Sequence, residues 1–189
     1  VTVNPAYQKN ELKYVLEQSG SEAIYYVADF RGNPMQEIAD AVCDEVPAIT
    51  HRILLTDHDA LFAGEHVGEL RSPKPSDAVQ IQYTSGTTGF PKGALLHHNG
   101  LVRNALDTMI RGGLKSGDSF VHHMPLFHTT GCAVLVMGVI GTGCTMLLAP
   151  MFDPEVITEI IERERTMFIF GVPTMLVALI DEARRSGRD

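Results

Sequence analysis

The sequence has 189 residues, of which 44% are hydrophobic and 20% are charged, an ordinary composition for a globular protein that buries a core. Its 15 basic and 23 acidic residues give a formal net charge of -8, and no basic run occurs. We therefore expect no nucleic-acid partner, because a protein that grips nucleic acid normally carries a basic patch or stripe.

The first 77 residues predict two helix–strand pairs followed by an irregular connection. Asn10 is a suitable helix cap, and Gly20 is a suitable stop for the helix that follows it. The connection over 57–77 contains two glycines, two prolines and many charges, which is typical of a surface segment. The predicted elements are a helix over 11–19, a strand over 23–28, a helix over 34–42 and a strand over 52–56.

From residue 78 onward, predicted strands alternate with predicted helices. Val79, Ile81 and Tyr83 alternate with two glutamines, a pattern typical of a half-buried strand over 78–83. Asp153 and Pro154 favour a helix start, since aspartate caps well and proline fits the first helical position. The further elements are a helix over 98–111, a strand over 119–124, a helix over 154–164, a strand over 167–170 and a last helix to about residue 185. This order predicts an α/β fold with a largely parallel sheet.

Residues 129–152 carry no charged side chain, and a run of this length has to be tested as a membrane span. Gly138, Gly141 and Gly143 interrupt the run, and Pro150 lies near its end. The composition instead predicts a buried helix, a glycine turn and a buried strand, so we expect no transmembrane segment.

The three cysteines, Cys43, Cys132 and Cys144, are odd in number and show no C-x-x-C spacing. No signal peptide is visible at the amino end. We therefore expect reduced thiols in a cytoplasmic protein.

The stretch Tyr-Thr-Ser-Gly-Thr-Thr-Gly-Phe-Pro-Lys-Gly over 83–93 places hydroxyls, glycines and one lysine between a predicted strand and a predicted helix. Glycine lets backbone N–H groups approach a ligand closely, and a helix N-terminus favours anions, so the layout indicates a phosphate-binding loop. Three familiar loops do not fit. A Walker loop needs a hydroxyl residue where Gly93 stands, the dinucleotide fingerprint is absent, and a hydrolase elbow needs glycine where Tyr83 stands.

This stretch resembles the signature of the adenylate-forming superfamily, which contains acyl-CoA synthetases, luciferases and the adenylation domains of peptide synthetases. Flanking stretches also resemble the family, and the last two are similar to its medium-chain fatty acyl-CoA synthetase branch. They lie at 3–7 with 11–16, at 125–128, at 149–154 and at 171–175. The resemblance covers the whole chain. It implies part of an acetyl-CoA synthetase/luciferase-like N-terminal domain, with α-β-α layers around a largely parallel sheet.

The resemblance implies a two-step, ATP-dependent reaction. A fatty acid carboxylate attacks the α-phosphate of ATP to give an acyl-adenylate, and the coenzyme A thiolate then displaces AMP to give a thioester. Mg²⁺ is the implied cofactor, and Thr84 matches a position that helps to hold it in relatives. The residues implied to contact the ATP phosphates are Thr84, Ser85, Gly86, Thr87, Thr88, Gly89 and Lys92.

The resemblance also assigns His128, with Thr129 and Gly131, to the wall of the acyl pocket near the substrate carboxylate. A zinc site is not expected. His122 and His123 would point to opposite faces of a strand, and no cysteine or carboxylate joins them at ligand spacing.

The family places its adenine-binding motif, its ribose-binding aspartate and its C-terminal lid domain with the catalytic lysine after this region. We therefore expect a partial AMP-binding domain over 1–189, with a core segment over 78–189 that holds the phosphate loop. We also expect this polypeptide to be inactive alone. Two other functions stay open here: an adenylation domain that loads an amino or aryl acid onto a carrier protein, and a non-catalytic nucleotide- or partner-binding role. The acyl chain length and the oligomeric state are not set by the sequence.

Overall fold

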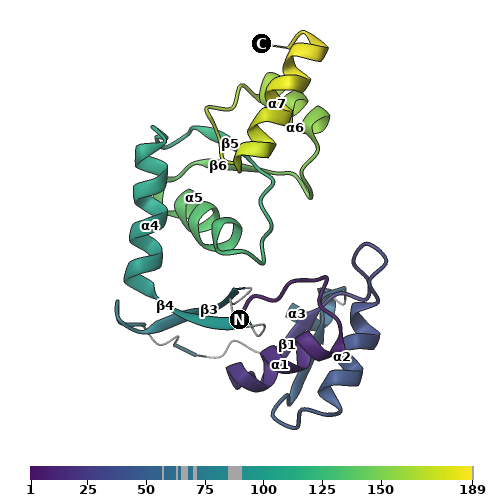
Figure 1. Ribbon diagram of the computed structural model, residues 1–189. Helices are drawn as coiled ribbons and strands as arrows, with labels where there is room; N and C mark the ends of the chain where they lie inside the picture. Colours follow the sequence, from purple (N-terminus) through teal and green to yellow (C-terminus); the bar gives the residue numbers. More distant parts are fainter. Residues whose placement is uncertain (57, 63, 65–67, 70–71, 85–90, 189) are drawn as a thin grey trace. The chain divides into compact units, whose positions relative to one another are not determined.

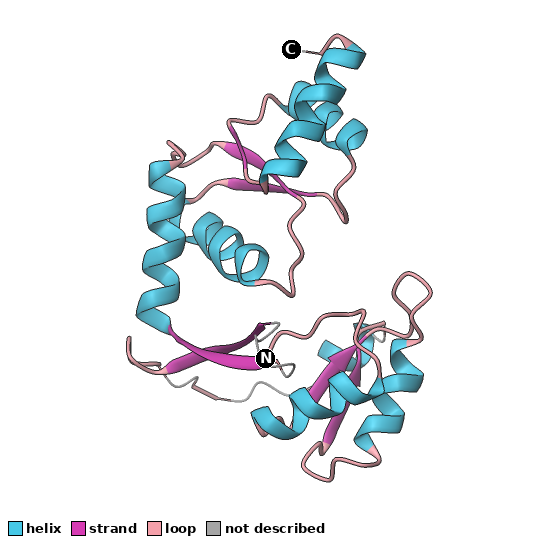
Figure 2. Cartoon of the chain, in the orientation of Figure 1, coloured by secondary structure: helices cyan, strands magenta, loops and turns pink. Residues whose placement is uncertain are grey.

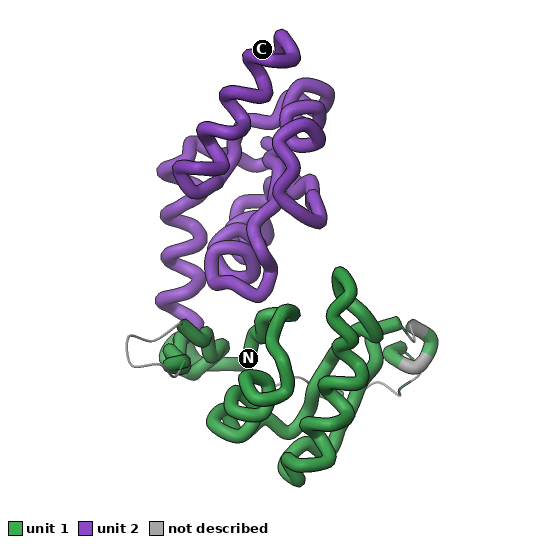
Figure 3. Tube along the Cα trace, turned by 45° about the vertical axis from the view of Figure 1, so that its right-hand side comes forward, with its two compact units in different colours: residues 1–96 green, residues 97–189 purple. Residues whose placement is uncertain are grey.

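The computed structural model describes residues 1–56, 58–62, 64, 68–69, 72–84 and 91–188. The chain forms two compact units, Val1–Leu96 and His97–Asp189 (Figure 3). The predicted core segment over 78–189 therefore has residues in both units.

The first unit contains two small sheets. Its elements are α1 (Lys9–Ser19), β1 (Ala23–Tyr26), α2 (Met35–Cys43), β2 (His51–Leu54), α3 (His58–Phe62), β3 (Ala78–Thr84) and β4 (Lys92–His97) (Figure 1). Strands β1 and β2 pair in parallel, with Ala23 opposite His51, and β3 pairs with β4. The four elements predicted before residue 57 are confirmed. Gly20 ends α1 with φ 64°, whereas Gln8, and not Asn10, occupies the cap position.

The core of the first unit lies where α1 and α2 meet β1. A helix with apolar residues at three- and four-residue spacing buries one stripe, and Leu12 and Leu16 of α1 do so here. The other buried members are Tyr26, Ala39, Val42, Cys43, Val46 and Ile49. Helix α1 is therefore fixed against the unit's interior.

Strand β3 is half-buried, but its inward residue differs from the prediction. Gln82 is buried, whereas Val79 is exposed. The reason is a contact from the amino end of the chain: Thr2 forms a parallel bridge with Gln82, and its hydroxyl donates to Gln82 Oε1 at 3.0 Å. Burial of the amide costs little because it is hydrogen-bonded.

Strand β4 corrects the predicted strand–loop–helix layout. It stands between the signature stretch and the following helix, so that helix does not begin directly after the loop. Gly93 leaves room for two side chains of β3, since a Cβ at this position would lie 2.9 Å from Ile81 Cγ2 and 3.3 Å from Tyr83 Cζ. The helix N-terminus that was expected to favour anions therefore does not lie at the end of this loop.

The second unit is a three-layer sandwich. Its elements are α4 (His98–Arg111), β5 (Ser119–His122), η1 (Thr130–Leu135), α5 (Val136–Thr142), β6 (Thr145–Leu148), α6 (Pro154–Glu164), β7 (Phe168–Ile169) and α7 (Pro173–Ser186) (Figure 2). The strands are parallel in the order β6-β5-β7. Phe120 packs on one face of the sheet with Met109 and Leu135, and Val121 packs on the other with Ile157 and Leu179. The predicted α/β class with α-β-α layers is confirmed.

The uncharged run folds into the predicted helix, turn and strand, but the strand is less buried than predicted, since Thr145 and Leu148 of β6 are exposed. The π-helical η1 continues into α5, Gly143 turns the chain with φ 71°, and β6 follows. Gly138 and Gly141 are not turn residues. They lie in α5 and let it approach α4, since a Cβ on each would come within 2.6 Å and 2.5 Å of Met109 and Leu106 side-chain atoms. Within the described residues, no helix has the length and apolar character needed to cross a membrane.

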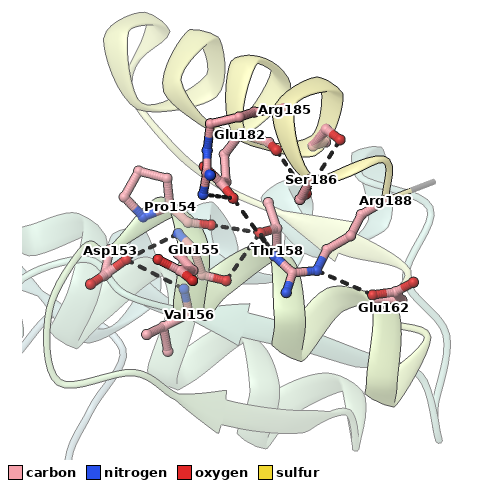
Figure 4. Close-up of polar contacts among 11 residues, drawn as sticks. Asp153, Pro154, Glu155, Val156, Thr158, Glu162, Glu182, Arg185, Ser186 and Arg188 are labelled. Carbon is pink, nitrogen blue, oxygen red and sulfur yellow. Dashed lines mark hydrogen bonds and ion pairs between the residues drawn. The ribbon is translucent and has the colours of Figure 1, made fainter.

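Helix α6 begins as predicted at the Asp153-Pro154 pair. The Asp153 carboxylate accepts hydrogen bonds from the backbone N–H groups of Glu155 and Val156, at 3.0 and 3.3 Å (Figure 4). At the far end of α7, Arg188 bridges back to Glu162 of α6 at 3.3 Å. The Arg188 bridge joins the end of α7 to α6, and Ile157 and Leu179 pack both helices on one face of the sheet.

Candidate functional site

The two ends of the signature stretch meet at the base of a loop. Thr84 is the last residue of β3 and Lys92 is the first of β4, and both are exposed. The Thr84 hydroxyl donates to the Lys92 carbonyl oxygen at 3.5 Å. A hydroxyl oxygen and an ammonium side chain therefore leave the sheet from neighbouring positions. Ser85, Gly86, Thr87, Thr88 and Gly89, the other predicted phosphate contacts, lie outside the described residues.

An open groove of about 600 Å³ lies beside Lys92. Its lining comes from α1, β3 and the start of β4, and includes the rings of Tyr14 and Tyr83. Burial, followed by the neighbouring Tyr14 and Tyr7, raises the pKa of Tyr83, so its hydroxyl stays protonated and acts as a donor. Lys92 is the one charged residue that lines the groove within the described residues, so it supplies the positive charge.

His128, the first predicted pocket residue, lies in the loop between β5 and η1 and is exposed. Its backbone N–H donates to the Pro125 carbonyl at 3.1 Å, and its ring Nδ1 accepts from the Thr130 N–H at 3.2 Å. Because Nδ1 is an acceptor, Nε2 carries the proton of the neutral ring. His128 can therefore present one N–H donor to an anion. Thr129 follows it and is partly buried.

Gly131 is a packing residue beneath this loop. A Cβ here would lie 2.2 Å from the Pro125 carbonyl oxygen and 3.0 Å from that of Met124, so no side chain fits without moving the backbone. The Gly131 carbonyl pairs with Nε2 of the buried His122 at 3.1 Å. Sequence reasoning missed this support by His122, and only the unusual position of a polar residue inside a buried strand could have signalled it.

His123 faces the other side of the sheet, as predicted for adjacent strand residues. Its ring lies 5.3 Å from that of Phe152, and neither ring nitrogen has a hydrogen-bond partner within the described residues. Burial, and then the neighbouring His122, lower the pKa of His123. The ring is therefore neutral near pH 7. Across the described ranges, no group of three or more His, Cys, Asp or Glu residues is placed to hold a metal ion.

The predicted site residues thus fall into two regions. Thr84 and Lys92 lie at the edge of the first unit's β3–β4 sheet, and His128, Thr129 and Gly131 lie together at the carboxyl end of β5. In parallel sheets, ligands bind outside the carboxyl ends of the strands.

Comparison with known families gives one match that spans nearly the entire chain. The model of the family described as AMP-binding enzyme matches residues 1–188. The chain belongs to the AMP-binding enzyme family. The resemblance predicted from residues 83–93 is confirmed.

Two curated relatives illustrate this AMP-binding family. The human "Medium-chain acyl-CoA ligase ACSF2, mitochondrial" is 32% identical over 225 residues, which cover 100% of this chain and 36% of that protein. The "Feruloyl-CoA synthase" of an Amycolatopsis species is 34% identical over 113 residues, which cover 60% of this chain and 23% of that protein. The chain therefore spans about a third of the length of the ACSF2 relatives.

A solved structure has the same fold as this chain. The ATP-bound MatB of Rhodopseudomonas palustris superposes with a TM-score of 0.81 at 26% identity, over 96% of this chain and 36% of that one. The predicted acetyl-CoA synthetase-like N-terminal fold is thus confirmed.

Proposed function

We propose that this chain supplies the phosphate loop and part of the acyl pocket of an ATP-dependent fatty acid–CoA ligase. The observation that carries the proposal is the family match over residues 1–188, together with a medium-chain acyl-CoA ligase that aligns along the whole chain. The local geometry supports it, because Thr84 and Lys92 meet at the base of the signature stretch.

The proposed reaction has two steps. A fatty acid carboxylate oxygen attacks the α-phosphorus of ATP, the bond to the β-phosphate bridging oxygen breaks, and pyrophosphate leaves. The coenzyme A thiolate then attacks the acyl carbonyl carbon, the bond to the phosphate oxygen breaks, and AMP leaves. Reactions of this kind ask a protein mainly for positioning and for neutralisation of charge.

In this scheme, Lys92 neutralises charge on the β- and γ-phosphates, because an ammonium group binds phosphate as a compact point charge. The hydroxyls and N–H groups of 84–89 are proposed to donate to the same oxygens. His128 Nε2–H is proposed to orient the substrate carboxylate, and the close packing of Gly131 fixes the loop that carries His128.

The chain's own fit to magnesium is modest. Thr84 offers one neutral hydroxyl oxygen, which can coordinate a metal ion while its proton is donated to the Lys92 carbonyl oxygen. Magnesium suits such a site, since it usually keeps several waters and is bound through substrate phosphates with few protein ligands. The ion would offset phosphate charge.

A second candidate substrate is an aryl acid. The alignment with a feruloyl-CoA synthase supports it, although over a smaller part of this chain than the ACSF2 alignment covers. An amino acid substrate and a non-catalytic binding role are the remaining alternatives. A cytoplasmic location stays a prediction. The ACSF2 relative is named mitochondrial, so cell fractionation should compare the cytoplasm with mitochondria.

Pyrophosphate release tests the proposed function. The assay contains ATP, magnesium and a panel of fatty, aryl and amino acids, with the 189-residue chain and the full reading frame that encodes it run side by side. Turnover with fatty acids by the full reading frame, and formation of the CoA thioester, are expected. Turnover only with aryl or amino acids would show that the substrate is such an acid and not a fatty acid. No turnover with any acid would favour the non-catalytic binding role.

A further inference from the structure

Two tyrosines lie beside the backbone around Lys92 and connect this region to α1. The Tyr14 hydroxyl of α1 donates to the Pro91 carbonyl oxygen at 3.0 Å, and the Tyr83 hydroxyl donates to the Val15 carbonyl oxygen of α1 at 3.4 Å. The two rings pack edge to face, with centroids 6.5 Å apart and planes at 73°. We call Tyr14 and Tyr83 the tyrosine clamp.

The Tyr14 contact fixes a peptide plane that contains the Lys92 nitrogen. The peptide bond is planar, so the Pro91 carbonyl and the Lys92 N–H move as one unit. The proline ring further restricts rotation on the preceding side. A hydrogen bond to the Pro91 oxygen therefore orients the start of Lys92.

The Tyr83 ring restricts the position of the backbone that follows Lys92. It packs beneath Gly93, where an added Cβ would meet Tyr83 Cζ at 3.3 Å and Ile81 Cγ2 at 2.9 Å. Because glycine has no side chain, the backbone that leaves Lys92 lies directly on this ring. The Pro-Lys-Gly order thus corresponds to two contacts. The carbonyl before the lysine is held by Tyr14, and the glycine after it lies close to the Tyr83 ring.

The clamp is anchored in the unit's core. Helix α1 buries Leu12, Val15 and Leu16, with Val15 fully inaccessible. Gln18 Nε2 donates to the Tyr14 hydroxyl at 2.8 Å, which directs the hydroxyl proton toward Pro91. A functional group is held precisely when the residues that support it are themselves locked by packing and hydrogen bonds.

We propose that Tyr14 and Tyr83 are positioning residues, which aim Lys92 at the phosphates of ATP by fixing its backbone to α1. The inference rests on the proposed function of Lys92, but its structural half can be measured without any turnover. Tyr14 contributes more than Tyr83 to the position of Lys92, because the hydrogen bond of Tyr14 is shorter.

The test compares Tyr14→Phe and Tyr83→Phe with wild type in the full reading frame. Both variants keep the ring and remove only the hydroxyl. The matched control is Tyr25→Phe, an exposed tyrosine on β1 for which no hydrogen bond is seen within the described residues. The two readouts are the KM values for ATP, acid and coenzyme A, and hydrogen–deuterium exchange at the Lys92 and Gly93 amides.

We expect Tyr14→Phe to raise the KM for ATP roughly two- to ten-fold, the range for one lost hydrogen bond, without changing the other two KM values. Exchange at Lys92 and Gly93 should quicken by a similar factor, and Tyr25→Phe should match wild type. A purely structural role would instead lower kcat through loss of folded enzyme and leave the KM for ATP unchanged.

An unchanged KM for ATP in Tyr14→Phe would overturn the inference, and so would unchanged exchange at Lys92 and Gly93. If wild type itself shows no ATP-dependent turnover, the proposed function fails. The exchange measurement then decides the clamp by itself, so the two failures are distinguishable.

Discussion

At the scale of single residues, the phosphate loop combines positions that resemblance identified with contacts that only the fold reveals. Thr84 and Lys92 belong to the signature, and their meeting across 3.5 Å follows from strand pairing at its two ends. Tyr14 lies 77 residues before Pro91, so no local pattern could have joined them. Sequence reasoning identifies reactive groups more easily than it identifies the residues that support them.

Lys92→Ala should raise the KM for ATP about ten- to a hundred-fold and slow adenylation, because loss of a charge-assisted contact costs roughly 1.5–3 kcal/mol. Pyrophosphate release at subsaturating ATP in the full reading frame measures this. Lys74→Ala is the control, since Lys74 is also an exposed lysine of the first unit. An adenylation rate equal to wild type at low ATP would remove Lys92 from the phosphate site.

His123 should make folding sensitive to acid. Its folded-state pKa lies below the ordinary value of about 6.5, so the unfolded chain binds more protons as the pH falls below that value. Stability is therefore complete above about pH 6.5 and is lost as the pH decreases. Urea unfolding of His123→Leu from pH 7.5 to 5.5 should show a flatter dependence, with a change of at most about 1.4 kcal/mol per pH unit for one proton.

The control for this measurement is His51→Leu, because His51 is exposed on β2. That variant should keep the wild-type slope. Equal slopes in wild type and His123→Leu would show that another group causes the acid sensitivity.

At the scale of elements, strongly periodic helices were predictable and a short paired strand was not. The helix over 98–111 was predicted with the observed bounds of α4, since its apolar residues recur at helical spacing over several turns. The residues of β4, Lys-Gly-Ala-Leu-Leu-His, do not alternate, and β4 exists because it pairs with β3. Similarly, Gln82 is buried by Thr2, a partner from the far end of the unit.

Helix α6 should depend on its cap. Asp153→Ala removes the acceptor for two backbone N–H groups and should lower the free energy of unfolding by about 0.5–2 kcal/mol. Asp153→Asn keeps an acceptor oxygen and should retain most of the stability. Urea unfolding of both variants, followed by circular dichroism, makes the comparison, and equal losses in the two would show that charge rather than capping is responsible.

At the scale of the whole molecule, the fold class was predictable because the order of elements restricts it. Strands alternating with helices give parallel sheets covered on both faces, and the second unit has this architecture. The division at residue 96 was not predictable. It depends on which side chains pack together, and no proline- or glycine-rich linker marks it in the sequence.

The net charge of -8 predicts that the chain does not bind nucleic acid. Non-specific binding comes chiefly from basic side chains that neutralise phosphates, with dissociation constants typically between about 10⁻⁴ and 10⁻⁶ M. Fluorescence anisotropy of a labelled duplex at physiological salt should stay constant to about 10⁻⁵ M protein, with a lysine-rich protein as the positive control. A rise in anisotropy that weakens as salt increases would contradict the prediction.

The placement of the aromatic residues also gives the chain an optical label. It has no tryptophan, and all five of its tyrosines, Tyr7, Tyr14, Tyr25, Tyr26 and Tyr83, lie within Val1–Leu96. Tyrosine emission and the tyrosine bands of the near-ultraviolet dichroism therefore report on the first unit alone, without a tryptophan to mask them. Two of the five chromophores, Tyr14 and Tyr83, pack edge to face and line the same groove as Lys92. Binding of a nucleotide at this lysine should therefore change the tyrosine spectrum, so that binding can be followed without an attached dye.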